Sequence, residues 1–388
     1  MRLLPSIYAS RNLGRSPLRL LLSVLGSAMV VLLVLAAGGF VRGMTSSLHS
    51  SADPHNIMIV GIGSEESLER SEIPASVASL LAASVPGLRT AHGVTFVSPE
   101  VHVQLPVHSD PSDTANRLTL VRGVTPTALL VHTQAQIIEG RFPRPGHDEI
   151  LAGRLAHTRI GVPPAALAVG NTLQIEGRAW TISGRLAAPN SVMDSELWMP
   201  LTDLKEATKR TTDSCAVATL QDAELADAQT FCRQRLDLEI AALSESAYYS
   251  KLAAFFGPVR AVAWVTAGLI ALGGVFGGLN IMYAAFASRT RELGMLQCLG
   301  YRRGAIVVSM MQESCLATAA GSLLAAALAL LFLDGLAVQF SMGAFGLRID
   351  SSILLLGLGA GLLLGLVGAL PPAIRCLRLP ITESLKSV

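Results

Sequence analysis

The sequence predicts an α-helical membrane protein with four transmembrane helices, both termini in the cytoplasm, and a large extracytoplasmic α+β domain between the first two helices. Three observations indicate this fold class. Only 15% of the residues are charged and the mean hydropathy is +0.50, whereas about a quarter of the residues in a soluble domain are charged. Four long stretches are almost free of charge, and the arginines gather on alternate connections between them.

Each apolar stretch is long enough to cross a bilayer, since a hydrocarbon core of about 30 Å needs roughly 20 helical residues. The first stretch exceeds the roughly 7–15 apolar residues of a signal peptide, so we expect an uncleaved anchor, although Ala36–Gly39 leaves a cleaved signal open. The predicted transmembrane helices are residues 20–43, 258–287, 305–333 and 351–374.

The short connections set the orientation, because loops rich in Lys and Arg stay in the cytoplasm. Arginines precede the first helix, occupy the connection between the second and third helices, and follow the fourth. The resulting segments are a cytoplasmic amphipathic N-terminal segment (1–19), an extracytoplasmic domain (44–257), a cytoplasmic connecting helix (288–304), a short outer loop (334–350) and a cytoplasmic tail (375–388).

The outer segment has a mixed α and β pattern. A helix is expected over Pro126–Glu139 and a hairpin around Gly177-Arg178. His102 alternates with valines, which predicts a position on the exposed face of a strand. Cys215 and Cys232 lie in this segment, and the sequence leaves open whether they form a disulfide or stay as free, buried thiols.

Several function classes are excluded by what the sequence lacks. It contains no phosphate-binding G-x-x-x-x-G-K-[ST], no G-x-S-x-G and no H-E-x-x-H. The eight histidines have no metal-ligand spacing, and a net charge of +2 does not favour a nucleic-acid partner. We therefore expect no catalytic residue, no metal and no cofactor in this chain.

Small residues and one acidic residue mark the transmembrane stretches. Glycines at four-residue spacing let helix backbones approach closely. We expect one of the two glycine faces to pack within the bundle and the other to form a dimer contact. Glu313 is placed at the cytoplasmic interface, because Ser314–Leu333 alone can span, rather than on an ion path. The glycines are Gly273, Gly274, Gly277 and Gly278 in the second stretch and Gly357, Gly361 and Gly365 in the fourth.

The connection from Ala287 to Gly304 has more structure than a charged loop requires. Leu293, Leu296 and Leu299 recur at three-residue spacing between basic ends. An apolar helical stripe on a cytoplasmic connection is typical of a helix that docks on a partner.

Several motifs together resemble the FtsX-like permease family, in its macrolide-exporter and lipoprotein-release type of ABC membrane subunit. A departure is Ala325, where a further glycine is expected after Gly321. The motifs are Arg11–Gly26, Asn280–Met282, Arg289–Gly294, Leu299-Gly300, Gln312-Glu313, Gly368–Ala373 and Leu379–Leu385, and in the outer segment Val121–Pro126, Glu139–Arg141, Glu149–Ala152 and Ser195–Pro200.

The resemblance implies a dimer of permease subunits, identical or different, in a bacterial inner membrane with a periplasmic core domain. Two separate cytoplasmic ATPases would bind ATP and Mg²⁺, and a periplasmic adaptor would be a further partner. Leu293 and Leu299 would anchor the connecting helix in the ATPase. The residues implied in this coupling are Arg289, Arg291, Glu292, Leu293, Gly294, Leu296, Leu299, Gly300, Arg302 and Arg303.

The resemblance also implies the work done. Movement of the periplasmic domain, as mechanotransmission, would export or extract a lipid, lipoprotein, peptide or drug. The alternative is a regulator that transmits the ATPase's conformational change to a periplasmic cell-wall hydrolase. An ion-coupled carrier is disfavoured, because charged residues within the helices and inverted repeats are lacking.

Overall fold

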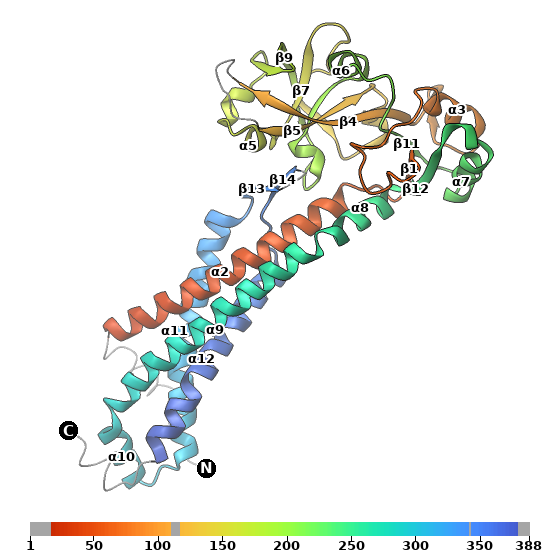
Figure 1. The fold of residues 1–388 in the computed structure, drawn as a ribbon. Coiled ribbons are helices and arrows are strands. Elements are labelled where there is room, and N and C mark those ends of the chain that lie inside the picture. Colours follow the sequence, from red (N-terminus) through yellow and green to blue (C-terminus); the bar gives the residue numbers. More distant parts are fainter. Residues whose placement is uncertain (1–16, 110–116, 341–342, 379–388) are drawn as a thin grey trace. The chain divides into compact units, whose positions relative to one another are not determined.

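A computed structural model describes residues 17–109, 117–340 and 343–378. The chain divides into two compact units (Figure 1). The first, here called the helical unit, comprises the described residues up to Arg42, then 258–336, and those from Leu347 onward. The second, here called the large domain, comprises residues 43–257 together with Ala337–Gly346.

The four predicted transmembrane stretches are helices, each long and apolar enough to cross a membrane. α2 continues past the predicted end at residue 43, and α11 ends in a π-helical turn, η4. A short helix, α10, lies in the connection between α9 and α11. The bounds are α2 (Pro17–Ser50), α9 (Gly257–Ala287), α10 (Thr290–Cys298), α11 (Arg303–Leu328), η4 (Ala329–Leu333) and α12 (Ser351–Arg378).

Glycines allow α2, α11 and α12 to pack closely. A Cβ at Gly357 would stand 2.5 Å from Leu35, and one at Gly361 would overlap Ser322. A Cβ at Gly365 would meet Thr318 and the backbone of Cys315. The glycine face of α12 therefore packs inside the helical unit.

The glycines of α9 behave differently. A Cβ at Gly274 would stand 2.7 Å from Val30 of α2, so this residue lies on an internal contact. At Gly273, Gly277 and Gly278, a Cβ would have no described atom within 4 Å outside its own helix and chain neighbours. These three glycines leave room beside α9.

The large domain is built on a sheet of ten strands among the described residues, in the order β12-β1-β11-β4-β5-β10-β7-β9-β6, with β8 paired to β4 and β9. The strands are β1 (Asn56–Gly61), β4 (Val97–His108), β5 (Leu118–Val124), β6 (Gln136–Gly140), β7 (Glu149–Gly153), β8 (Thr172–Ile175), β9 (Arg178–Ala187), β10 (Leu197–Pro200), β11 (Cys215–Thr219) and β12 (Ile240–Ser244).

Short helices and turns surround this sheet. They are α3 (Val77–Ser84), α4 (Ala128–Val131), α5 (Ala156–Ile160), η1 (Pro164–Leu167), η2 (Val192–Ser195), α6 (Leu201–Thr208), α7 (Leu225–Gln234), η3 (Leu236–Leu238) and α8 (Glu245–Phe255), with a small hairpin of β2 (Thr90–Ala91) and β3 (Val94–Thr95). The predicted hairpin at Gly177-Arg178 is confirmed as β8 and β9. The helix expected over 126–139 is wrong: only α4 is helical, and Gln136–Gly140 pairs with β9 instead.

The two largest apolar cores of the described large domain lie on different parts of its sheet. One gathers Val101 of β4, Trp180 of β9 and Leu204 of α6, and the other gathers Ile57 of β1, Leu81 of α3 and Phe231 of α7. β4 contributes to both, because its first half pairs with β11 and its second half with β5.

The connection between α11 and α12 is a hairpin rather than a plain loop. β13 (Ala337–Phe340) pairs with β14 (Gly343–Gly346), and the pair belongs to the large domain. The backbone N–H of Ala344 donates to Ser195 Oγ at 3.0 Å, and the Gln339 amide donates to the Thr158 carbonyl. The sequence predicted a plain loop over residues 334–350, and the structure instead has this hairpin within that range.

We expect Gly321→Ala to destabilise the helical unit, because its Cβ would stand 2.6 Å from the Val24 carbonyl oxygen and 3.0 Å from the Ala28 nitrogen of α2. Backbone atoms cannot rotate away, so overpacking should cost about 1–3 kcal/mol. The unfolding temperature of the purified chain measures this cost. Gly277→Ala, which meets open space, is the control, and equal unfolding temperatures for the two variants would contradict the packing described.

Candidate functional site

α10 has an apolar inner side and a mixed outer side. Leu293 is 4% exposed and packs with Phe286, Ile306 and Leu377 of the other helices, and Leu296 lies against the same cluster. On the outer side, Met295 is 48% exposed, and Leu299, directly after the helix, is 74% exposed. The outer side can therefore offer apolar surface to a partner, and the inner side cannot.

This arrangement corrects one implied anchor. Leu293 faces the helical unit, so it cannot be an anchor for a partner, whereas Leu299 remains available. The helix ends at Cys298 and Gly300 has a φ of +88°, so Leu299 leaves the stripe that Leu293 and Leu296 share. Met295 was missed because it falls outside the three-residue spacing.

The other residues implied in coupling divide between the two sides. Arg291, Gly300, Arg302 and Arg303 are exposed, Gly294 is buried, and Arg289 and Glu292 are half-buried. The exposed arginines surround Met295 and Leu299 in the sequence. The outer side of this connection is therefore apolar at its centre and basic at its ends.

Glu313 lies buried beside this connection. Its Oε2 accepts from Arg289 Nη1 at 3.2 Å, and its Oε1 accepts from Arg19 of α2. Arg289 Nε also donates to Glu292 Oε2 at 3.0 Å. The position of Glu313 relative to a bilayer stays a prediction, but its charge is paired within the helical unit.

In the large domain, strand register brings charged side chains onto one face of the sheet. Glu100 of β4 stands opposite Cys215 of β11, and His102 stands opposite Arg122 of β5. Arg122 in turn stands opposite Trp198 of β10. All five side chains are buried, so ionised groups here must be paired.

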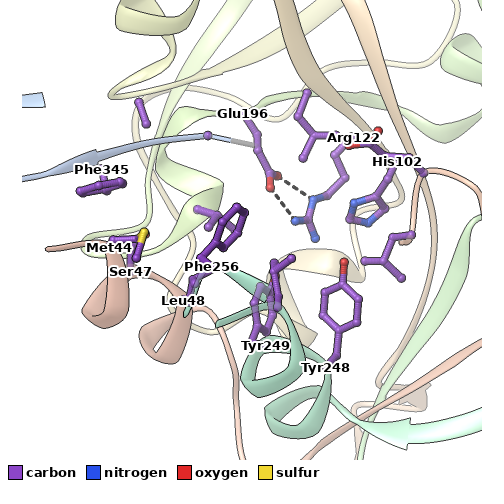
Figure 2. Close-up of a pocket in the computed structure, with 17 residues that line it drawn as sticks. Met44, Ser47, Leu48, His102, Arg122, Glu196, Tyr248, Tyr249, Phe256 and Phe345 are labelled. Carbon is purple, nitrogen blue, oxygen red and sulfur yellow. Dashed lines mark hydrogen bonds and ion pairs between the residues drawn. The ribbon is translucent and has the colours of Figure 1, made fainter. Parts of the chain in front are cut away.

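Arg122 lies at the centre of this buried network, and Figure 2 shows its guanidinium facing Glu196. Its guanidinium binds Glu196 through two bonds, Nε to Oε2 at 2.7 Å and Nη2 to Oε1 at 2.8 Å. Nη1 donates to Glu100 Oε2 at 2.9 Å. The Trp198 indole N–H donates to Glu196 at 2.9 Å, so both carboxylates are held by charged and neutral donors.

The network extends through His132 to Glu245 at the start of α8. His132 Nε2 lies 2.7 Å from Glu100 Oε1, and His132 Nδ1 lies 3.7 Å from Glu245 Oε1. Glu245 Oε2 accepts from the backbone N–H of Asp53 at 2.9 Å and from the Asn56 amide at 3.0 Å. Glu245 thus holds α8 to the segment that follows α2.

Protonation in this network follows from burial and neighbouring charge. Burial opposes ionisation of Glu100, but His132 and Arg122 outweigh it and hold its pKa well below the ordinary 4.5. Burial opposes protonation of His132, yet Glu100 and Glu245 raise its pKa above 6.5. Burial lowers the pKa of His102 and raises that of Glu245. The arrangement is a buried ion network in which the neighbouring carboxylates favour the protonated form of His132.

The prediction that His102 is exposed is wrong, because β4 is an inner strand and its second face is covered as well. His102, Glu100 and Cys215 offer atoms within 4.8 Å of one another. However, Arg122 and His102 share the same oxygen of Glu100, and burial raises the pKa of the Cys215 thiol well above 9.0. A cation would have to displace the guanidinium, so these residues fit a metal poorly.

Cys215 and Cys232 are both free thiols. Cys215 Sγ lies 3.9 Å from His102 Nε2 within the network, whereas Cys232 of α7 packs in the core with Ile57 and Phe231. The disulfide that the sequence left open is not formed.

An apolar pocket adjoins the network. It is a cavity of about 60 Å³ whose walls include Met44, Leu48, Tyr249, Phe256 and Phe345, with Arg122, His102 and Glu196 on one side (Figure 2). A cavity this small holds only a few waters, so we assign it no ligand.

The chain matches two known families. Residues 20–230 match the MacB-like periplasmic core domain, and residues 264–381 match the FtsX-like permease C-terminal domain. An uncharacterized ABC transporter permease of Bacillus subtilis (strain 168), YknZ, is 23% identical over 395 residues, which cover 96% of this chain and 95% of the relative.

Two solved structures resemble part of the chain. The crystal structure of the periplasmic region of MacB from Actinobacillus actinomycetemcomitans is 12% identical, with a TM-score of 0.38, and covers 52% of this chain and 94% of that one. The extracellular domain of the ABC-type transporter YknZ from Gram-positive bacteria is 12% identical, with a TM-score of 0.37. The match covers 49% of this chain and 100% of that one. Both TM-scores are low, so the family assignment depends on the two family matches.

We expect His132 to give the large domain a pH-dependent stability. A pKa that is raised in the folded state stabilises the fold below the unfolded value of 6.5 and loses that effect as pH rises through the folded pKa. The difference in unfolding temperature between the natural chain and His132→Gln should therefore be largest at mildly acidic pH and shrink as pH rises. A difference that stays constant or grows with pH would contradict the assignment.

Proposed function

Because this chain belongs to the family of ABC transporter permeases with a MacB-like periplasmic core domain and an FtsX-like permease C-terminal domain, we propose that it transmits ATP-driven movement across the membrane. A separate cytoplasmic ATPase hydrolyses ATP, the helical unit moves, and the large domain acts on cargo outside the membrane. The cargo is a lipid, lipoprotein, peptide or drug. The protein is a multi-pass membrane protein of the bacterial inner membrane, with its large domain in the periplasm.

The observation that carries this proposal is the outer side of α10. An amphipathic helix whose inner leucine is buried and whose outer apolar residues are exposed needs a partner with an apolar groove. Leu299 and Met295 supply the anchors and the neighbouring arginines supply charge. The density of arginines supports a cytoplasmic position for this connection and both termini, which is where an ATPase would bind it.

In the proposed orientation the large domain lies on the opposite side of the membrane, because α2 and α9 each cross once. The buried network supports a domain that moves as a rigid part, since Glu245 ties α8 to the segment after α2. Two permease subunits pair with two ATPases, which supply the ATP and Mg²⁺ binding that we expect this chain to lack. Gly273 and Gly277 are exposed on α9, and we propose them as the contact with the second permease, since small residues favour close helix contact.

The docking proposal is tested by Met295→Asp combined with Leu299→Asp. Two carboxylates on the outer side should abolish co-purification with the partner ATPase, because the apolar anchors are lost and an acidic patch replaces them. Membrane insertion and the unfolding temperature should stay unchanged, since both residues are exposed.

The matched control is Leu236→Asp, a leucine that is 76% exposed on the large domain. It should leave co-purification intact. An unaltered pull-down by the Met295→Asp, Leu299→Asp double variant would refute α10 as the docking helix. Loss in the Leu236→Asp control as well would show that the assay reports general damage.

A further inference from the structure

Three helical segments that are far apart in the sequence meet at Glu313. Arg19 comes from α2, Arg289 directly precedes α10, and Glu313 belongs to α11. The side chains of Glu313, Arg289 and Arg19 are only 8%, 14% and 18% exposed. We call Arg19, Arg289 and Glu313 the Glu313 cluster.

Burial makes these ion pairs unlike surface salt bridges. An exposed pair contributes little, because water and salt screen it and the side chains move freely. In the Glu313 cluster each carboxylate oxygen has its own arginine, so loss of one partner leaves a buried charge incompletely paired. Glu313 is also the single acidic residue in the four described apolar helices. The two arginines therefore balance the buried charge of Glu313.

The chain itself does not connect α10 to α2. Two residues join α9 to α10 and four join α10 to α11, and Gly300, with its φ of +88°, gives the α11 connection a tight turn. α2 is a separate helix that leads into the large domain at Gly43. From Arg19 to Gly43 it runs for about 36 Å at a rise of about 1.5 Å per residue. A displacement of α10 therefore reaches the start of α2 through noncovalent contacts between the helices.

We propose that Glu313 is a positioning residue that couples α10 to α2, so that the two helices move together when the ATPase displaces α10. This inference rests on the proposed function, because it assigns the residue that carries the movement from the docking helix. Arg289 holds Glu313 to the start of α10, and Arg19 holds it to α2. An ion path is a poorer account of Glu313, since both of its oxygens are already bound to arginine.

The test measures the distance between α2 and α10 directly. Spin labels are attached at Leu18→Cys, where the leucine is 69% exposed, and at the exposed native Cys298, in a full chain whose other cysteines are replaced. In lipid nanodiscs without the ATPase, the intact chain should give a narrow distance distribution. Glu313→Gln, which keeps the shape and removes the charge, should broaden it.

Arg19→Gln is the second variant, because it removes one arginine and leaves Glu313 paired with Arg289. It should broaden the distribution as Glu313→Gln does, and the double variant should broaden it no further, since both changes break the same link. Glu313→Asp, which retains the charge, should restore part of the narrow distribution. The control is Asp350→Asn, which removes the 2.7 Å bridge to Arg42 near the other end of α2 and should leave the α2–α10 distance unchanged.

The same labelled chains are then studied with the partner ATPase. In the intact complex the distance should stay constant when ATP is added, whereas in Glu313→Gln it should shift. If both Glu313→Gln and Arg19→Gln keep the narrow distance of the intact chain, with and without ATP, the inference is overturned. A chain that never binds an ATPase would instead overturn the proposed function, because the measurement without the ATPase still reports on the cluster.

Discussion

Ion pairs between buried carboxylates and arginines are the interactions on which both units depend. In the large domain, Glu100 and Glu196 share the guanidinium of Arg122, and the three residues come from different strands or from the segment before one. In the helical unit, Glu313 receives Arg19 and Arg289. Moving a charged group from water into the protein interior costs free energy, so these groups are stable only when their partners are held in place. Each cluster therefore specifies how distant segments meet.

This principle gives the two units complementary roles. The large domain is stiff where α8 begins, because Glu245 binds the backbone and side chain of the segment that follows α2. The helical unit is closely packed along α2, α11 and α12, where glycines replace larger side chains. Stiff elements joined by specific charge pairs can carry a displacement without absorbing it, which is what a mechanical account of this permease requires.

Much of this architecture could be predicted from the sequence because the membrane imposes simple rules. A bilayer needs apolar length, and the four helices follow from that requirement. Burial was harder to predict. Alternation around His102 correctly indicates which neighbours share a face, but it does not reveal that β4 is an inner strand. The helix expected over 126–139 failed because Gln136–Gly140 gains strand partners in β9. Leu293 was misassigned because spacing identifies a stripe and not the side that a partner contacts.

The account depends most on α10 and the large domain lying on opposite sides of the membrane. The most direct measurement is labelling with a membrane-impermeant maleimide in spheroplasts, using the exposed native Cys298 and, in a separate variant, Leu236→Cys in the large domain. The account predicts that Leu236→Cys is labelled from outside and that Cys298 reacts only after the membrane is permeabilised. Labelling of both positions from the same side would contradict it.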